Sequence, residues 1–553
     1  MSSIYCPLTI KYLYENYKVD SDVQDSKLIQ PKINGWIKTY RKQKDVSFIS
    51  LNDGSTIKCL QIVFETKLIP YSIQSKLGTG VSISVQGDLI KSPKKDQDDL
   101  TKCPKNNQDD LTKYPKNNQD DLTKYPKKDQ DDLTKCPKKD QDDLTKYPKK
   151  DQDFELKIIS ENDLIIHGIN IDPNPIAKTK LGIDYLRTIP HLRIRTNTFS
   201  SIARIRHQLA MATHDFFGKV KEFVLVAPPQ ITCNDCEGGG EAFQVTTILQ
   251  DQNILRDQLN SKANKIDYKN DFFKSPAYLT VSGQLALETY CLALGGVYCY
   301  QSAFRADPSQ TSRHVAEFTM LEVEIPFADL SDNMNLAQEY IKYAINHVLT
   351  NCKLDIEFLD KFYYQKREKS NKFKPTLVEY LQSLIDEDFI RLSYTDVMKT
   401  LLDVQKKGHK FETSIPESGI FDFKSEHERY LTDILLKKPV FVTNYPAEIK
   451  AFYMKPSAAN NGTVECCDLL VPGIGEVLGG SSRTSDYNVL KESMIKHNLI
   501  DSELDYYLDL RKYGSIEHCG FGIGMSRLMM LLTGMENIRD MIEFPRTMGS
   551  IHF

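Results

Sequence analysis

Long hydrophobic runs are missing from this sequence of 553 residues. No stretch approaches the ~18 consecutive apolar residues that a membrane-spanning helix needs. The first residues also lack the basic segment and apolar core of a signal peptide, and the Arg- and Ser-rich, acid-poor composition of a transit peptide. We therefore expect a cytoplasmic protein with no membrane association.

An excess of charge of either sign is also missing. The 71 Lys and Arg residues nearly balance 75 Asp and Glu residues, and the formal net charge is −4. Such a chain has no general attraction to nucleic acid, so DNA binding is not expected, although a local basic groove would not change the total. With 40% hydrophobic residues, the chain has enough apolar material for a core of two to four domains, which excludes a fibrous or wholly disordered protein.

The cysteines do not form a recognisable framework. There are 12 of them at irregular spacing in a long chain, a pattern that is not typical of disulfide-stabilised proteins. Cys233 and Cys236 form a lone C-x-x-C without a second ligand pair, and Cys466 and Cys467 are adjacent, so their side chains diverge. We expect reduced thiols rather than a structural zinc site.

A repeat occupies Pro93–Asp151, where the unit P-K-[KN]-[DN]-Q-D-D-L-T-K-[YC] recurs every 11 residues. Each unit offers only a Leu and a Tyr or Cys, too little apolar surface for the stacked units of a solenoid. Regular prolines also limit any helix to about two turns. The repeats predict a flexible, solvated insertion, with partner binding as the alternative.

Short strand-like runs flank this insertion. Five such strands in ~100 residues fit a small closed barrel, of which the OB fold is the commonest. We therefore predict an OB-fold domain over residues 1–170, with the insertion at 93–151 in the loop before the last strand. The expected strands are Ile33–Tyr40, Val46–Leu51, Leu60–Glu65, Val81–Leu89 and Phe154–Ser160.

Prolines in Ile171–Ile176 indicate a linker over 171–192, followed by a second domain over 193–553. Ser201–Phe223 places apolar residues on one helical face. Beyond it, helices and strands alternate irregularly, which favours an α+β domain with a largely antiparallel sheet flanked by helices over a doubly wound parallel sheet. Expected strands are Ala277–Val281, Gly296–Tyr300, Phe318–Glu324, Thr443–Met454 and Val464–Val471; expected helices are Asn335–Cys352 and Lys374–Asp386.

Three glycines, Gly520, Gly522 and Gly524, precede Arg527 in a pattern similar to G-x-G-x-x-G. The surrounding βαβ unit and downstream acid of a dinucleotide site are missing. The other interpretation is a glycine-rich strand that lets a planar ligand approach the backbone and that runs into a helix carrying Arg527.

Basic and aromatic side chains cluster between two predicted strands. Arg305, Arg313 and His314 precede Phe318, a combination that suits an anion clamp beside a stacked base. A salt-bridged surface hairpin is the alternative. Spaced carboxylates near such arginines suit Mg²⁺ bridging a nucleotide; the candidates are Glu237, Glu241, Glu288, Asp468 and Glu476.

Together these segments resemble the class II aminoacyl-tRNA synthetases. The helix and strand ending at Pro229, the FRAD…SRHVAEF segment and the GFGIGMSR segment are similar to motifs 1, 2 and 3 of that family. The predicted barrel resembles subclass IIb. HLRIRTNTFSSIARIR, CEGGGEAFQVTT, LTVSGQLALE, PGIGEVLGGSSR and the ending EFPRT resemble its asparaginyl members, particularly the bacterial form.

The resemblance implies a two-step ligase of protein synthesis. The carboxylate of L-asparagine attacks the α-phosphorus of ATP, and the acyl group then passes from the adenylate to the 3′-terminal ribose of tRNA(Asn). Mg²⁺ accompanies ATP, and motif 1 forms a homodimer. No protein nucleophile is needed, so the chemistry rests on positioning and on neutralising phosphate charge.

Roles carry over where the motifs match. Arg305 would hold the α-phosphate and the amino-acid carboxylate, Arg313 and His314 would meet the outer phosphates, and adenine would stack between Phe318 and Arg527.

Further matched positions serve the metal and the amino acid. Asp468 and Glu476 would bind Mg²⁺, which places Glu476 with Arg305 and Arg527 in the catalytic group. Glu237 and Gln284 would hold the α-amino group.

Two positions depart from the family pattern. Asp307 replaces the Glu of F-R-x-E on the adenine side, and Ser526 replaces the acid that commonly precedes the motif 3 arginine.

Specificity is expected from three positions. Arg483 would read the side-chain oxygen of the substrate. Aspartyl enzymes carry a Lys where this chain has Leu287, and the next residue here is Glu288. An aspartate carboxylate would lose a cation and face an anion, whereas a neutral amide could donate to Glu288. A bracing role for Glu288 behind the site is the alternative.

The resemblance also implies anticodon contacts in the barrel, where Phe48 would stack on a base with Arg41 and Gln61 beside it. The alternatives are a core residue for Phe48 and a solvated charge for Arg41. For the whole chain, the competing hypotheses are an aspartyl or nondiscriminating relative and a noncatalytic tRNA-binding paralogue.

Overall fold

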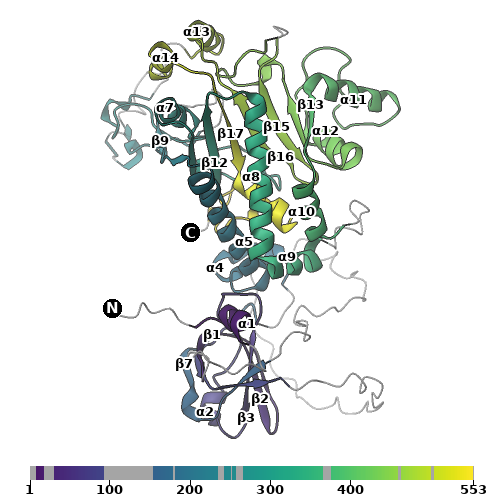
Figure 1. Cartoon of the computed structure of the whole chain (residues 1–553). Coiled ribbons are helices and arrows are strands. Elements are labelled where there is room, and N and C mark those ends of the chain that lie inside the picture. Colours follow the sequence, from purple (N-terminus) through teal and green to yellow (C-terminus); the bar gives the residue numbers. More distant parts are fainter. Residues whose placement is uncertain are drawn as a thin grey trace, which may run out of the picture. The chain divides into compact units, whose positions relative to one another are not determined.

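The computed structural model describes residues 8–17, 30–92, 154–177, 181–233, 242–364 without 251, 254 and 257–265, 375–458, 462–499 and 504–551. The repeats, Cys236, Glu237 and Glu241 lie outside these ranges. The chain divides into two compact units, Met1–Leu181 and Gly182–Phe553 (Figure 1). Among the described residues, no helix combines the length and hydrophobicity needed to cross a membrane.

The first unit is a closed barrel. Its strand order is β5-β6-β3-β2-β1-β4-β7. In the sequence, β4 and β5 are separated by Gly87 alone, although four strands lie between them in this order. The sheet must therefore bend until these two strands come close together, which closes the barrel. A Cβ at Gly87 would lie 2.1 Å from the carbonyl oxygen of Lys157, so only glycine fits there. The elements are α1 Ile10–Asn16, β1 Lys32–Lys42, β2 Val46–Asn52, β3 Leu60–Glu65, α2 Tyr71–Gln74, β4 Ser82–Gln86, β5 Asp88–Lys91, β6 Phe154–Lys157 and β7 Leu164–Gly168.

This topology confirms the OB-fold prediction. β3 pairs in parallel with β6, and β1 pairs with both β2 and β4. Alternating side chains such as Ile33, Ile49 and Ile62 fill the interior. The sequence analysis missed β7, a short strand that pairs along β4 after the barrel has closed.

The second unit is built on an eight-stranded sheet of order β13-β14-β15-β16-β17-β12-β11-β8. Neighbours from β14 to β11 are antiparallel, whereas β13 and β8 join the two edges in parallel. The α+β prediction is therefore confirmed, with a mixed sheet. The strands are β8 Val224–Leu225, β11 Val297–Phe304, β12 Glu317–Pro326, β13 Ile390–Ser393, β14 Val440–Thr443, β15 Cys466–Val471, β16 Gly475–Ser482 and β17 His518–Gly524.

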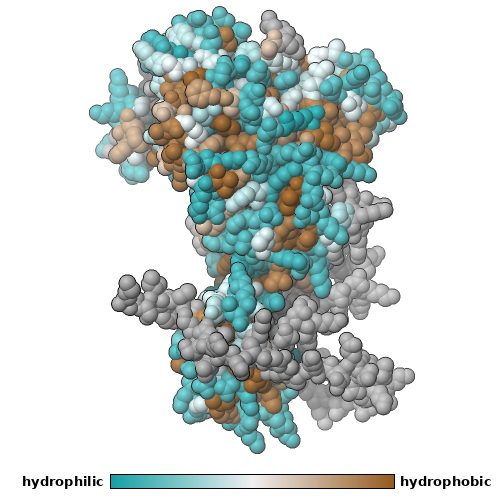
Figure 2. All heavy atoms as spheres, viewed as in Figure 1, coloured by the Kyte–Doolittle hydropathy of each residue, from teal (hydrophilic) through white to brown (hydrophobic). Residues whose placement is uncertain are grey.

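Helices cover this sheet, and α8 crosses one face beside α5 (Figure 1). A capping box from Asp329 and Asp332 starts α8. Polar residues such as Asn335 and Glu339 face outward from it, on a surface where hydrophilic side chains predominate (Figure 2). The helices include α3 Ile183–Thr188, α4 Pro190–Arg193, α5 Asn197–His214, α7 Gln284–Leu294, α8 Leu330–Asn351, α9 Lys353–Leu359, α10 Leu377–Asp386, α11 Tyr394–Lys406, α12 Ser425–Arg429, α13 Tyr487–Lys496, α14 Asp505–Lys512 and α15 Met525–Thr533; a small separate sheet pairs β9 Ile231–Thr232 with β10 Tyr278–Leu279.

Two local expectations need correction. The helix expected over Ser201–Phe223 starts earlier, as α5, and its end is a π-helix over Asp215–Val220. The extended segment expected over Thr443–Met454 is wrong. β14 ends at Thr443 because Asn444 has a left-handed φ of 58°, and a single 3₁₀ turn follows at Ala447–Ile449.

Candidate active site

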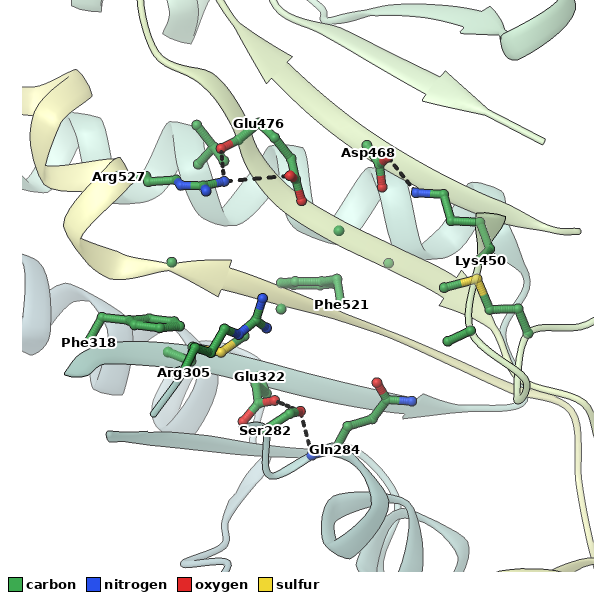
Figure 3. A pocket seen from close by; sticks show the side chains of 18 of the residues that line it. Ser282, Gln284, Arg305, Phe318, Glu322, Lys450, Asp468, Glu476, Phe521 and Arg527 are labelled. Atoms are coloured by element: carbon green, nitrogen blue, oxygen red, sulfur yellow. Dashed lines mark hydrogen bonds and ion pairs between the residues drawn. The ribbon is translucent and has the colours of Figure 1, made fainter. Parts of the chain in front are cut away.

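A cavity of about 650 Å³ opens over the antiparallel strands of the second unit (Figure 3). β12 contributes side chains at every second position, as a strand must when one face is turned to a cavity. The cavity brings together ten residues predicted from the sequence: Gln284, Arg305, Asp307, Arg313, His314, Phe318, Asp468, Glu476, Arg483 and Arg527. Glu288 lies behind its wall, and Glu237 lies outside the described residues.

The glycine-rich strand leads directly into a helix, as predicted. β17 ends at Gly524, and Arg527 lies in the first turn of α15. The physical reason for one glycine differs from the prediction. A Cβ at Gly520 would lie 2.2 Å from Oε1 of Glu324, so this glycine makes room for a protein carboxylate rather than for a planar ligand.

Arginines gather at one end of the cavity. The guanidinium of Arg305 lies 5.6 Å from the ring centre of Phe318. Arg527 donates to the carbonyl oxygen of Glu476 at 2.7 Å. Burial, followed by the nearby charges of Arg429 and Arg527, lowers the pKa of Arg313 to about 10. An anion placed among these arginines would relieve their mutual repulsion, so this end suits phosphate groups.

The motif 2 departure leaves Asp307 at the rim of this end. Its Oδ1 accepts from the backbone N–H of Ser309 at 2.8 Å, and its other oxygen lies 3.8 Å from Nε2 of His314. Ser526, the second departure, is buried at the start of α15 and also lines the cavity.

Two carboxylates face one point beside the arginines. A Cβ at Gly479 would lie 3.5 Å from Oε1 of Glu476 and 3.6 Å from Oδ1 of Asp468. Burial and Glu476 raise the pKa of Asp468, although Lys450 acts in the opposite direction. Carboxylate oxygens in this arrangement are the donors that Mg²⁺ prefers.

Lys450 is a site residue that the sequence analysis missed. Its Nζ donates to Oδ2 of Asp468 at 2.6 Å (Figure 3) and lies 4.0 Å from the ring centre of Tyr445. Lys450 follows the turn at Asn444, in the segment wrongly expected to be extended, so no local pattern pointed to it.

Arg483 lies at the other end of the cavity, where each of its three guanidinium nitrogens donates to a protein oxygen. Nε and Nη2 donate to Glu324 at 3.3 and 2.6 Å, and Nη1 donates to Oγ of Ser481 at 2.7 Å. Glu324 was also missed. Its signal was present, because Glu322 and Glu324 lie two positions apart in the predicted strand Phe318–Glu324 and so share one face.

Glu288 is fully buried next to Arg483. Its oxygens accept from Tyr507 at 2.8 and 2.7 Å, from Arg511 at 2.7 Å and from Gln284 at 3.1 Å, and His518 lies 3.0 Å away. This geometry fits the bracing alternative, because the carboxylate is engaged by protein groups and, of these four partners, only Gln284 lines the cavity.

A metal does not suit this second cluster of acids. Ligand atoms of Glu288, Glu324 and His518 lie within 4.8 Å of one another. Arg483 and Arg511, however, are ion-paired with these carboxylates, so their charge is already balanced.

The predicted anticodon residues lie on neighbouring strands of the barrel. Arg41 on β1 pairs in register with Phe48 on β2, and its guanidinium lies 5.7 Å from the ring centre. Phe48 alternates with the buried Ser47 and Ile49, so it is on the outer face and is not a core residue. Gln61 on β3 donates to Glu155 at 2.6 Å.

Comparison with known proteins adds independent evidence. A family model described as tRNA synthetases class II (D, K and N) matches residues 183–548. The asparagine–tRNA ligase of Clostridium tetani is 40% identical over 521 residues, which are 94% of this chain and 95% of that protein. The asparagine–tRNA ligase of Acetivibrio thermocellus is 38% identical over 545 residues, 98% and 99% of the two chains.

Solved structures share the fold. Asparaginyl-tRNA synthetase from Pyrococcus horikoshii, complexed with asparaginyl-adenylate, aligns with a TM-score of 0.71 at 24% identity over 99% of each chain. The Entamoeba histolytica enzyme in complex with asparaginyl-adenylate aligns with a TM-score of 0.69 at 24% identity, over 96% of this chain and 98% of that one. The chain therefore belongs to the class II tRNA synthetases, and within them to the asparagine–tRNA ligase family.

Proposed function

We infer that the protein is an asparagine–tRNA ligase, which activates L-asparagine with ATP and transfers it to the 3′-terminal ribose of tRNA(Asn). The observation that carries this inference is one cavity in which Arg305, Arg313 and Arg527 lie at one end and Arg483 lies at the other, over the same sheet. Near full-length similarity to asparagine–tRNA ligases supports the same activity.

At the arginine-rich end, Arg305 holds the α-phosphate and the substrate carboxylate, and Arg313 and His314 receive the outer phosphates. Adenine stacks between Phe318 and Arg527. No side chain needs to act as nucleophile, because aligning the carboxylate with the phosphorus and neutralising the developing charge supply the rate enhancement.

Asp468 and Glu476 would hold Mg²⁺ with ATP, because their oxygens face the same point beside Gly479. Bound there, the ion would neutralise phosphate charge. The ammonium group of Lys450 is ion-paired with Asp468 and holds this carboxylate in place.

Substrate choice is assigned to the other end. Arg483 offers its remaining N–H groups to the side-chain oxygen of asparagine. Glu324 already balances the charge of Arg483, and the anion of Glu288 lies 3.9 Å from Nε. A second carboxylate from aspartate would therefore be poorly paired in a dry pocket.

The remaining assignments concern assembly and tRNA. We assign residues 1–170 to anticodon binding, through the outer face that carries Arg41, Phe48 and Gln61, 171–192 to a linker, and 193–553 to catalysis in the cytoplasm. A homodimer through the segment from α5 to β8 is supported by exposed apolar side chains, namely Met211, Val220, Val224 and Leu225.

Asparagine-dependent ATP–pyrophosphate exchange, followed by charging of tRNA(Asn) with labelled asparagine, tests this function. We expect both reactions. Exchange without charging would support a different acceptor, and the absence of both would support a noncatalytic tRNA-binding protein.

A further inference from the structure

Three side chains surround Glu288 without reaching the cavity. Tyr507 and Arg511 come from α14, and His518 starts β17. None of the three belongs to the described lining of the cavity. Their contacts with Glu288 give these residues a route by which they can influence the substrate.

Arg511 is held more firmly than an ordinary ion-pair partner. Its Nη2 lies 2.7 Å from Oε2 of Glu288 and 3.0 Å from the hydroxyl of Tyr507, and its Nε donates to the carbonyl oxygen of Thr484 at 2.9 Å. The side chains of Arg511 and Glu288 are both wholly inaccessible to solvent. This fixed geometry places a permanent positive charge against the carboxylate.

The charge state of Glu288 depends on its neighbours. Burial raises the pKa of this carboxyl, and Arg511 is the strongest opposing influence, followed by His518 and Arg483, so the net shift is downward. Removal of Arg511 would leave burial with weaker opposition and would favour the protonated acid.

Other groups face Glu288 as well. Nδ1 of His518 lies 2.9 Å from the carbonyl oxygen of Ile516, and its Nε2 lies 3.0 Å from Oε2 of Glu288. Glu324, engaged by Arg483, lies close by, and Cys291 lies on the same helix as Glu288.

Glu288 transmits its charge to the cavity through Gln284. Nε2 of Gln284 donates to Oε1 of Glu288 at 3.1 Å, so the carbonyl oxygen of Gln284 is turned away from Glu288. Gln284 lines the cavity (Figure 3) and in this orientation offers an acceptor to an amide or ammonium group. A protonated Glu288 could instead donate to that oxygen, and the amide would then turn its NH₂ group toward a carboxylate.

We propose that Arg511 is a specificity-determining positioning residue, which keeps Glu288 anionic so that the cavity accepts the neutral amide of asparagine and repels the carboxylate of aspartate. The proposal rests on the proposed function. It adds α14, none of whose residues lines the cavity, to the determinants of substrate choice.

The test compares kcat/KM for asparagine and aspartate in ATP–pyrophosphate exchange, from about pH 6 to about pH 9, using the full chain. In the wild type Glu288 stays anionic over this range, and we expect a preference for asparagine at every pH; burial raises the pKa of the neighbouring Glu324 to about 7, a contribution common to the wild type and the Arg511 variants. In Arg511→Met the preference should fall by about tenfold or more at low pH and recover as pH rises, because Glu288 then loses its proton. Arg511→Lys, which keeps the charge, should restore most of the preference at low pH.

Two further variants separate positioning from a general structural effect. Glu288→Gln should show a weakened preference at every pH, and Arg511→Met with Glu288→Gln should be no worse than Glu288→Gln alone. Arg391→Met, at an exposed arginine on β13 that contacts Ser331 and Asn335, should match the wild type.

A wild-type preference in Arg511→Met at low pH would overturn the proposal, as would an equal loss at all pH values. If Arg511→Met does not fold, the variant that combines Arg511→Met with Glu288→Gln tests the proposal in its place. Recovered folding with the preference of Glu288→Gln supports the proposal, and a double variant that stays unfolded overturns it. Absence of asparagine-dependent exchange in the wild type would instead contradict the proposed function.

Discussion

The two ends of the cavity differ in how completely their charges are paired by the protein itself. At the nucleotide end, the side chains of Asp307, His314 and Glu476 are 47%, 41% and 45% exposed. At the amino-acid end, Glu288 is wholly buried and Arg483 is 3% exposed, and both have protein partners. The nucleotide end therefore has charged groups that remain accessible to a highly charged ligand, whereas the charged groups of the amino-acid end are already paired within the protein.

This difference has a physical reason. Phosphates and a metal ion bring enough charge to organise flexible side chains on binding. Asparagine and aspartate differ by a single polar group, so discrimination requires donors and acceptors that cannot rearrange to suit the wrong one. Rigidity is therefore concentrated where substrates are most alike.

The largest effect should come from breaking the assembled end. Arg483→Met leaves Glu324 buried without its partner, which should cost about 3–5 kcal/mol of unfolding free energy as well as asparagine activation. Thermal unfolding and exchange measure the two losses. A variant that loses activity but keeps the wild-type Tm would contradict the account of this end.

The open end should behave in the opposite way. Arg305→Ala should lower exchange by ~100- to 1,000-fold, because one phosphate-binding group is lost, yet it should leave Tm nearly unchanged. Arg391→Ala is the matched surface control. Exchange above a tenth of the wild-type rate would refute the role of Arg305.

A smaller effect is expected outside the cavity. Phe48→Ala on the barrel should weaken tRNA binding by about 1–3 kcal/mol, since a stacked base loses its aromatic partner. Charging should show this as a raised KM for tRNA, whereas ATP–pyrophosphate exchange, which needs no tRNA, should not change. A parallel drop in exchange would argue against an anticodon role.

The smallest effect concerns Glu428 on α12, an acid close to Arg313 and Glu476. Burial, followed by Glu476 and Asp468, raises the pKa of Glu428 to about 7. Because the folded protein holds this proton more tightly than the unfolded chain, the acid lowers stability as pH rises from about 4.5 to about 7, and the loss persists above that range. Glu428→Gln should therefore raise Tm by about 2–4 °C near pH 8 and have no effect near pH 4.

Glu426 on the same helix is the matched control. Backbone N–H groups of Thr413 and Glu412 donate to it and outweigh burial, so its pKa is lowered. Glu426→Gln should lower Tm near pH 8, the opposite sign. Equal responses of the two variants would show that Glu428 is not held near neutrality.

The sequence predicted two of the elements that carry the site. These are the strand Phe318–Glu324, which lies within β12, and the glycine-rich strand before Arg527, which is β17. Motif matches identified Arg305, Asp468 and Glu476 as site residues, and the structure places all three in one cavity. Both kinds of prediction use information that is contained within a short segment of the sequence.

Residues fixed by long-range packing escaped prediction. Glu324 meets Gly520 only because β12 and β17 pair in that register. Arg511 reaches Glu288 across 223 positions of the chain, and Lys450 depends on the turn at Asn444. No pattern within a window of sequence contains such information.

The most direct test of the central claim is ATP–pyrophosphate exchange by the wild-type protein with asparagine and aspartate side by side. A preassembled, charge-balanced amino-acid end predicts kcat/KM for asparagine at least ~100-fold above that for aspartate. Equal values, or a larger value for aspartate, would contradict the claim.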